Sequence, residues 1–232
     1  NYQCDLIHQG NGVGYYAALA LDVTGQPRIA YQAGGDGLWY AQPSNPGNCG
    51  PSNYWDCSSI YASPGAGKYA SLAVDKANTP HVAYYDEGKL VYAALKGANG
   101  NCGSLNAWQC DVIDTMGTDP HTRDVSLTVD KAGLPMIAYH QYILGSQFSL
   151  VSLKVARPAA ALGLPSANCG PGNHWRCESL RTFGHASDYS AIAVRPSGLA
   201  TIAYLYSEYQ GSLRVAFQRF HQVFLPLVVR DQ

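Results

Sequence analysis

The residues of this chain whose types and spacing could do chemistry are its cysteines. Three ten-residue segments, NCGPSNYWDC (48–57), NCGSLNAWQC (101–110) and NCGPGNHWRC (168–177), each carry two cysteines eight positions apart. Zinc sites commonly need two closely spaced couples of the CxxC kind. Evenly repeated couples with seven intervening residues favour disulfides formed in an oxidising compartment. We therefore predict three bridges: Cys49–Cys57, Cys102–Cys110 and Cys169–Cys177.

The seventh cysteine, Cys4, has no such companion, because no Asn-Cys-Gly precedes it. An odd cysteine in an exported protein predicts a leftover thiol or a bridge to another molecule, and both alternatives stay open. The chain begins with Asn rather than Met, as expected after removal of a secretory signal. We expect a secreted protein, located outside the cell or at its surface.

Signatures of catalysis are missing. The sequence contains no GxSxG, HExxH, Walker or dinucleotide-binding motif. Asp22, Asp75 and Asp130 recur where a predicted strand meets its turn, a place where Asp caps the turn through nearby backbone N–H groups. Arg195 stands there in the fourth copy, so the fold does not need the carboxylate. We expect no enzymatic activity, no catalytic residues, no metal site and no cofactor.

Composition excludes further classes of function. Charged residues make up 13% of the 232 residues and the net charge is −1, whereas a nucleic-acid-binding protein shows a basic face. No run of eighteen apolar residues occurs, so no membrane-spanning helix is predicted.

The elements that must position the cysteines are strands repeated four times. One template, LAVDxxGxPxIAY, recurs with substitutions at 19–31, 72–84, 127–139 and 192–204. A third apolar run follows each copy, at 38–41, 90–93, 153–156 and 213–216, and a cysteine segment follows the first three. Alternating apolar residues rich in Tyr, Val and Ile, with tight turns between them, predict four-stranded antiparallel meanders.

The fourth copy lacks a cysteine segment, but the N-terminus supplies a fragment of one. NYQCDLI (1–7) matches NAWQCDVI, with Tyr2 in the Trp place and Cys4 in the place of the second cysteine. A first strand that completes the last unit closes a propeller and removes exposed sheet edges. The fold class predicted is all-β: a four-bladed β-propeller of four-stranded antiparallel blades, with the N-terminal strand completing the last blade and a disulfide in three connections between third and fourth strands.

These motifs resemble those of four-bladed β-propeller-like repeat proteins secreted by bacteria, and the resemblance covers residues 1–220. We predict one domain there, with blades at about 15–62, 69–115, 123–182, and 188–220 plus 1–9, and an apolar tail at 221–232. Three tryptophans stand two positions before the second cysteine of each segment. Because they recur in every copy, we expect Trp55, Trp108 and Trp175 to pack against a disulfide or a neighbouring blade rather than to stack on sugars.

The tail is too apolar to be exposed and has the composition of an edge strand with one Pro. It could pack on its own propeller. It could instead be the fourth strand of the last blade, leaving residues 1–7 free to complete another subunit, or it could lie on a neighbouring molecule. The expected assembly interface comprises Leu6, Ile7, Val223, Phe224, Leu225, Pro226, Leu227, Val228 and Val229.

The functional hypothesis is a secreted, non-enzymatic structural or adhesive protein that exchanges terminal β-strands. Its expected partner is a second copy, head to tail, giving a filament or a surface layer. The alternative is a lectin, with glycans as partners, because the turns between second and third strands are rich in aromatic residues. Its binding residues would be Trp39, Tyr85, Tyr142 and Tyr206. A glycosidase domain, which needs two facing carboxylates, is the third option.

Overall fold

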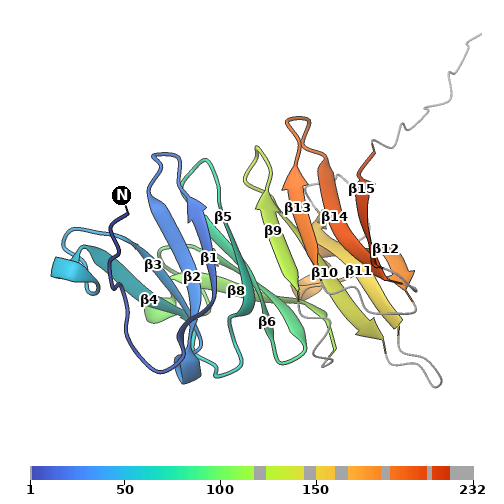
Figure 1. Cartoon of the computed structure of the whole chain (residues 1–232). Coiled ribbons are helices and arrows are strands. Elements are labelled where there is room, and N and C mark those ends of the chain that lie inside the picture. Colours follow the sequence, from blue (N-terminus) through green and yellow to red (C-terminus); the bar gives the residue numbers. More distant parts are fainter. Residues whose placement is uncertain are drawn as a thin grey trace, which may run out of the picture.

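The computed structural model describes residues 2–117, 124–143, 150–159, 167–183, 189–207 and 211–219. These residues form four antiparallel sheets, each built from strands that are consecutive in the sequence (Figure 1). The first three sheets have four strands, and the fourth has three. The prediction of an all-β repeat fold made of antiparallel meanders is confirmed.

The strands follow the repeats closely. The first sheet contains β1 (Val13–Leu21), β2 (Pro27–Ala33), β3 (Leu38–Pro43) and β4 (Trp55–Tyr61). The second contains β5 (Lys68–Val74), β6 (Pro80–Asp86), β7 (Lys89–Leu95) and β8 (Trp108–Thr115). The third contains β9 (Val125–Val129), β10 (Pro135–Ile143), β11 (Leu150–Pro158) and β12 (Trp175–Phe183). The fourth contains β13 (Ser190–Val194), β14 (Ala200–Ser207) and β15 (Gly211–Phe217).

The recurring aspartates cap the turns between first and second strands, as predicted. The Asp22 carboxylate accepts hydrogen bonds from the backbone N–H groups of Thr24 and Gln26, at 2.8 and 2.9 Å. Asp75 and Asp130 make the same pair of bonds in the second and third sheets. A side chain that satisfies two turn N–H groups fixes the tight connection locally.

The sheets stack face against face along the chain, and the core lies between them. Figure 1 shows the first strands of the sheets, β1, β5, β9 and β13, side by side in that order. A buried apolar cluster fills each of the three junctions between consecutive sheets. Each sheet therefore has a leading face, which covers the next sheet, and a trailing face, which covers the sheet before it.

The prediction that the N-terminal strand completes the fourth sheet is wrong for this structure. Residues 2–9 form no strand and lie against the first sheet, where His8 Nδ1 is 2.9 Å from the Tyr31 hydroxyl and the His8 ring is 5.0 Å from that of Trp39. The first and fourth sheets stand at opposite ends of the array (Figure 1), so the described residues do not close into a ring. The contacts of His8 with the first sheet favour this placement over pairing with β15.

The apolar tail lies outside the described residues, so its predicted place in an interface, Val223 to Val229, stays a prediction. No helix long and apolar enough to cross a bilayer occurs in the described part of the chain.

Burial of His140 predicts an acid-sensitive fold. Its side chain on β10 is fully buried, and burial lowers its pKa to about 4. Since the unfolded chain binds this proton near pH 6.5, the folded state loses stability as the pH falls from 6.5 towards 4. Between pH 7 and pH 5, His140→Gln should lose about 2 kcal/mol less of its free energy of unfolding than the wild type does. Urea unfolding at both pH values measures this, and parallel losses in the two proteins would contradict it.

Candidate functional site

Titratable side chains in the described residues serve mainly to join strands. No group of three or more His, Cys, Asp or Glu there could hold a metal ion. The Asp22 carboxylate is paired with Arg28 at 2.8 Å. His81 lies between the Asp75 carboxylate and the Tyr92 hydroxyl, at 3.3 and 2.5 Å, and burial lowers its pKa. These contacts hold neighbouring strands of one sheet together.

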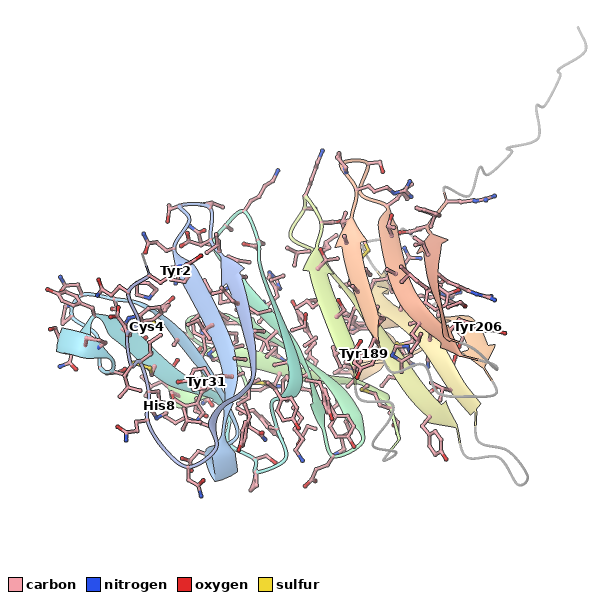
Figure 2. The ribbon with its side chains drawn as sticks, viewed as in Figure 1. Tyr2, Cys4, His8, Tyr31, Tyr189 and Tyr206 are labelled. Carbon is pink, nitrogen blue, oxygen red and sulfur yellow. A yellow bond between two sulfur atoms is a disulfide. The ribbon has the colours of Figure 1, made fainter. Side chains whose placement is uncertain are left out.

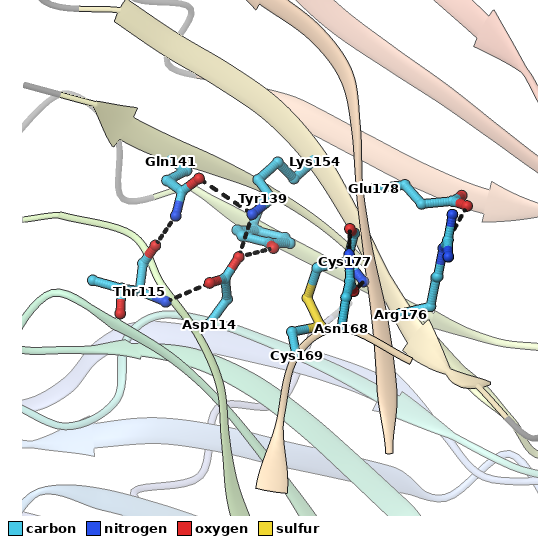
Figure 3. Close-up of a disulfide and its surroundings, with 10 residues drawn as sticks. All are labelled: Asp114, Thr115, Tyr139, Gln141, Lys154, Asn168, Cys169, Arg176, Cys177 and Glu178. Carbon is cyan, nitrogen blue, oxygen red and sulfur yellow. Dashed lines mark hydrogen bonds and ion pairs between the residues drawn. A yellow bond between two sulfur atoms is a disulfide. The ribbon is translucent and has the colours of Figure 1, made fainter. Parts of the chain in front are cut away.

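Polar contacts also join one sheet to the next. In Figure 3 the Asp114 carboxylate of the second sheet accepts a hydrogen bond from the Tyr139 hydroxyl of the third, at 2.5 Å, and forms an ion pair with Lys154. Burial raises the pKa of Tyr139, and the neighbouring Asp114 raises it further. The hydroxyl therefore stays protonated and acts as a donor at this junction.

The three predicted disulfides form, each with Cα atoms 5.9 Å apart. An asparagine completes each loop: Asn168 accepts a hydrogen bond from the Cys177 backbone N–H at 2.7 Å and donates one to its carbonyl at 3.0 Å (Figure 3). The other two loops repeat this pair of bonds. Cys4 is the free cysteine and is exposed.

Two of the recurring tryptophans join sheets and the third packs on the cluster that contains its own disulfide, which confirms the packing interpretation. Trp108 is 1% exposed, and its ring lies 5.3 Å from that of Tyr40 on the preceding sheet. The ring of Trp175 likewise lies 5.1 Å from the ring of Tyr92 on the preceding sheet. Trp55 belongs to the first sheet, which has no preceding sheet among the described residues, and it is only half-buried. Trp108 and Trp175 thus each fit a socket on the leading face of the sheet before them.

The leading face is covered in every sheet except the fourth. Leu38, Leu90 and Leu153 occupy equivalent positions on the third strands of the first three sheets, and each is 0% exposed. Leu213 occupies that position on β15 and is 80% exposed. Val215, two residues further along the same face, is also exposed. The last sheet therefore presents apolar side chains that all earlier sheets bury.

The trailing face is covered by another sheet in every sheet except the first, where residues 5–8 cover only part of it. Leu72, Leu127 and Ile192 begin the repeated template in the last three sheets and are buried against the sheet before them, at 6–8% exposure. Leu19 begins it in the first sheet and is 66% exposed. Leu21 on the same strand is exposed as well. The two ends of the array are thus halves of the junction that occurs three times within the chain, and no second sheet of the described chain covers either of them.

Both ends are hollowed. A depression of about 430 Å³ on the fourth sheet is lined by residues that include Tyr189, Ala203 and Leu213. Another, of about 260 Å³, lies between residues 5–8 and the first sheet, where Ile29 and Tyr31 line it. Tyr2, Cys4 and His8 lie at one end of the molecule in Figure 2, and Tyr206 of the fourth sheet lies at the other. We take these two surfaces as the candidate functional site.

The residues predicted to bind glycans come from four different sheets. Tyr85 and Tyr206 are buried, at 4% and 8% exposure, and the Arg214 guanidinium covers the Tyr206 ring at 3.6 Å. Neither ring presents a free face of the kind that a stacked sugar needs. Trp39 and Tyr142 are half-buried, so their role in binding stays a prediction.

Of the predicted interface residues that are described, Ile7 packs on the first sheet and Leu6 is exposed. Sequence reasoning missed Leu19 and Leu213, because each is an ordinary repeat position whose exposure depends on the absence of a neighbouring sheet. The signal that could have found them is the place of each residue in the first or the last repeat.

Comparison with known proteins adds little. No family model matches the chain, and no curated protein matches it. Among solved structures, an exo-1,5-α-L-arabinanase from a bovine ruminal metagenomic library is similar over 90% of this chain and 94% of that chain. The sequence identity is 9% and the TM-score is 0.33. A likeness at this level assigns neither a fold family nor an activity.

One prediction is nevertheless corrected by this comparison. The sequence predicted a protein without enzymatic activity, and the similar structure is that of an enzyme. We therefore withdraw the prediction that the chain is non-enzymatic.

Proposed function

We propose that this protein is a self-associating structural subunit of an extracellular assembly, in which the propeller-like sheets of successive copies continue one array. The proposal rests on a difference in side-chain exposure between leucines at one repeat position of the third strands. Leu213 on the leading face is 80% exposed, whereas its three equivalents are 0% exposed. Contiguous exposed apolar surface of this kind marks a protein interface.

The two ends are complementary because they are the two halves of a junction that the chain already makes three times. A copy that brings its first sheet onto the fourth sheet of another would bury Leu19 and Leu213 together. Burying one leucine contributes about 2 kcal/mol, and several such contacts together can offset the roughly 4–15 kcal/mol that association costs. An interface between two different surfaces is heterologous and gives rings or open filaments.

The disulfides support a place outside the cell. Three of them close loops within the described residues, and such bonds persist in oxidising compartments. The resemblance to secreted bacterial repeat proteins agrees with this location. The low share of charged residues suits a chain whose ends are covered in use.

Sedimentation velocity across a wide range of protein concentration tests the proposal. We expect species whose masses are multiples of 24.9 kDa and grow with concentration, and rings or filaments in electron micrographs of the native protein. A monomer of 24.9 kDa at every concentration would contradict the proposal.

A truncated chain shows whether the sheet ends or the apolar tail cause the association. Because the exposed faces of the first and fourth sheets supply the proposed contact, a chain that lacks Phe224–Gln232 should keep the assembly state of the full chain. Light scattering coupled to size exclusion measures both masses. If the truncated chain became monomeric while its circular dichroism stayed unchanged, the contact would belong to the tail instead.

A further inference from the structure

The fourth sheet ends in an edge strand, and a candidate for its missing neighbour lies at the other end of the chain. We infer that residues 2–8 of one copy pair with β15 of a second copy as the fourth strand of that sheet. This inference rests on the proposed self-association and specifies how it occurs. In the described structure residues 2–8 form no strand, and their backbone groups make no hydrogen bond to another described segment. Among the described residues, no strand pairs with the outer edge of β15, and an edge strand of this kind is a template for strand addition.

The three complete sheets fix the register of the pairing. In each of them an alanine of the third strand stands opposite the second cysteine: Ala41 with Cys57, Ala93 with Cys110, and Ala156 with Cys177. The equivalent alanine of the fourth sheet is Ala216, and the sequence match places Cys4 opposite it. Two positions further along, Tyr2 falls opposite Gln218, in the place that tryptophan occupies in the complete sheets.

A cavity is present where that aromatic side chain would enter. It has a volume of about 90 Å³ and lies between the third and fourth sheets, lined by residues that include Val155, Leu180 and Ala216. Val155 is the repeat equivalent of Tyr40, against which Trp108 packs. Tyr2 itself is fully exposed in the single chain. The cavity is the third copy of the tryptophan socket, and it lacks its side chain.

Leu180, which lines this cavity, is more exposed than the residues at the equivalent positions of the first two sheets. Ile60 and Ile113 hold the equivalent positions on the fourth strands of the first two sheets, and they are 0% and 2% exposed. Leu180 is 43% exposed. The tryptophan and disulfide of the following sheet cover the two isoleucines, which belong to the same clusters as those groups. A fourth strand on β15 would cover Leu180 in the same way.

The N-terminal segment already lies as the fourth strand of a preceding sheet would lie. Ile7 packs on the cluster of the first sheet that includes Cys57 and Trp55. Ile60 packs in the same manner on the cluster of the second sheet that includes Cys102 and Trp108. The segment can therefore stay on its own first sheet while its free edge pairs with β15 of another copy.

The remaining contacts of this junction follow from the internal ones. Leu72 packs with Ala30 and Leu38 of the preceding sheet. In the junction between copies, Leu19 would enter the hollow lined by Ala203 and Leu213, the equivalents of those two residues. The occupant is a second copy rather than the same chain, because the N-terminal segment and β15 lie at opposite ends of one molecule (Figure 1).

A disulfide trap tests the register. Residues directly opposite in an antiparallel pair have Cα atoms about 4.5–5.5 Å apart, within the roughly 4.4–6.8 Å that a disulfide spans. Ala216→Cys in the full chain should therefore bond to Cys4 of another copy under mild oxidation, giving a ladder of covalent multimers that reduction removes. Ser212→Cys, four residues away on β15 and so about 13 Å from that position, should give no ladder. Cys4→Ser combined with Ala216→Cys should give none either.

The outcomes are distinct. A ladder confined to Ala216→Cys supports the inference. A bond between Cys4 and the introduced cysteine within a single chain, identified by mass spectrometry of a monomer, would overturn the choice of a second copy. If the variant sediments as an assembly but forms no bond, the strand pairing is wrong while the proposed self-association survives. If the wild-type chain is monomeric at every concentration, the proposed function itself fails.

Discussion

Trp108→Ala is expected to lower the free energy of unfolding by about 3–5 kcal/mol, the range measured for buried large aromatic side chains. The side chain is 1% exposed and joins the second sheet to Tyr40 of the first. Its loss leaves a cavity between two sheets whose strands are held by other contacts, so the surroundings can close on it only in part. Urea unfolding at concentrations where the chain is monomeric gives the value.

The first repeat offers the matched control. Trp55→Ala changes the same position of the same motif, but in the described structure no sheet packs on this side of the first one, and the side chain is half-buried. We expect a loss of only about 1–2 kcal/mol, in proportion to the smaller apolar area removed from the core. Equal losses at the two positions would mean that the tryptophans stabilise their own loops and do not join sheets.

Leu213→Asp is expected to weaken self-association by more than roughly tenfold, because it removes about 2 kcal/mol of apolar burial and places a carboxylate in the contact. The folded chain should be unaffected, since the side chain is 80% exposed in the single molecule. Sedimentation equilibrium gives the association constant, and unfolding curves show that the monomer is intact.

The same substitution at a second leucine distinguishes the loss of apolar contact from the effect of added charge. Leu105 is 97% exposed in the turn of the second disulfide loop, and the second sheet is not at an end of the array, since clusters on both its faces join it to the first and third sheets. Leu105→Asp makes the same chemical change there and should leave the association constant unchanged. Equal weakening by both substitutions would show that added charge, and not loss of the leading face, opposes assembly.

The repeats made much of the fold predictable. Spacing placed all three disulfides, and the turn aspartates behaved as their position in the template indicated. These features are local, since each depends on contacts within one sheet. Recurrence also indicated packing for Trp108 and Trp175, although their partners lie on the neighbouring sheet.

Closure could not be predicted in the same way. The match of NYQCDLI to the cysteine segments shows which strand these residues resemble, but it does not show which sheet receives them. That choice depends on the rotation between successive sheets, which is set by side-chain packing at each junction. His8 and Ile7 contact the first sheet, and β15 lies at the other end of the array. For a similar reason, Leu19 and Leu213 could not be singled out. Their exposure depends on whether a neighbouring sheet of the described chain covers them, and not on residue type.

Mixing two blocked variants tests the complementarity of the ends most directly. Leu19→Asp disables the first sheet and leaves the fourth intact, whereas Leu213→Asp does the reverse. Each variant alone should sediment as a monomer, and an equimolar mixture should give a one-to-one complex, twice 24.9 kDa, that does not grow with concentration. A mixture that stays monomeric while the wild-type chain assembles would contradict the account, because these two faces would then not be each other's partners.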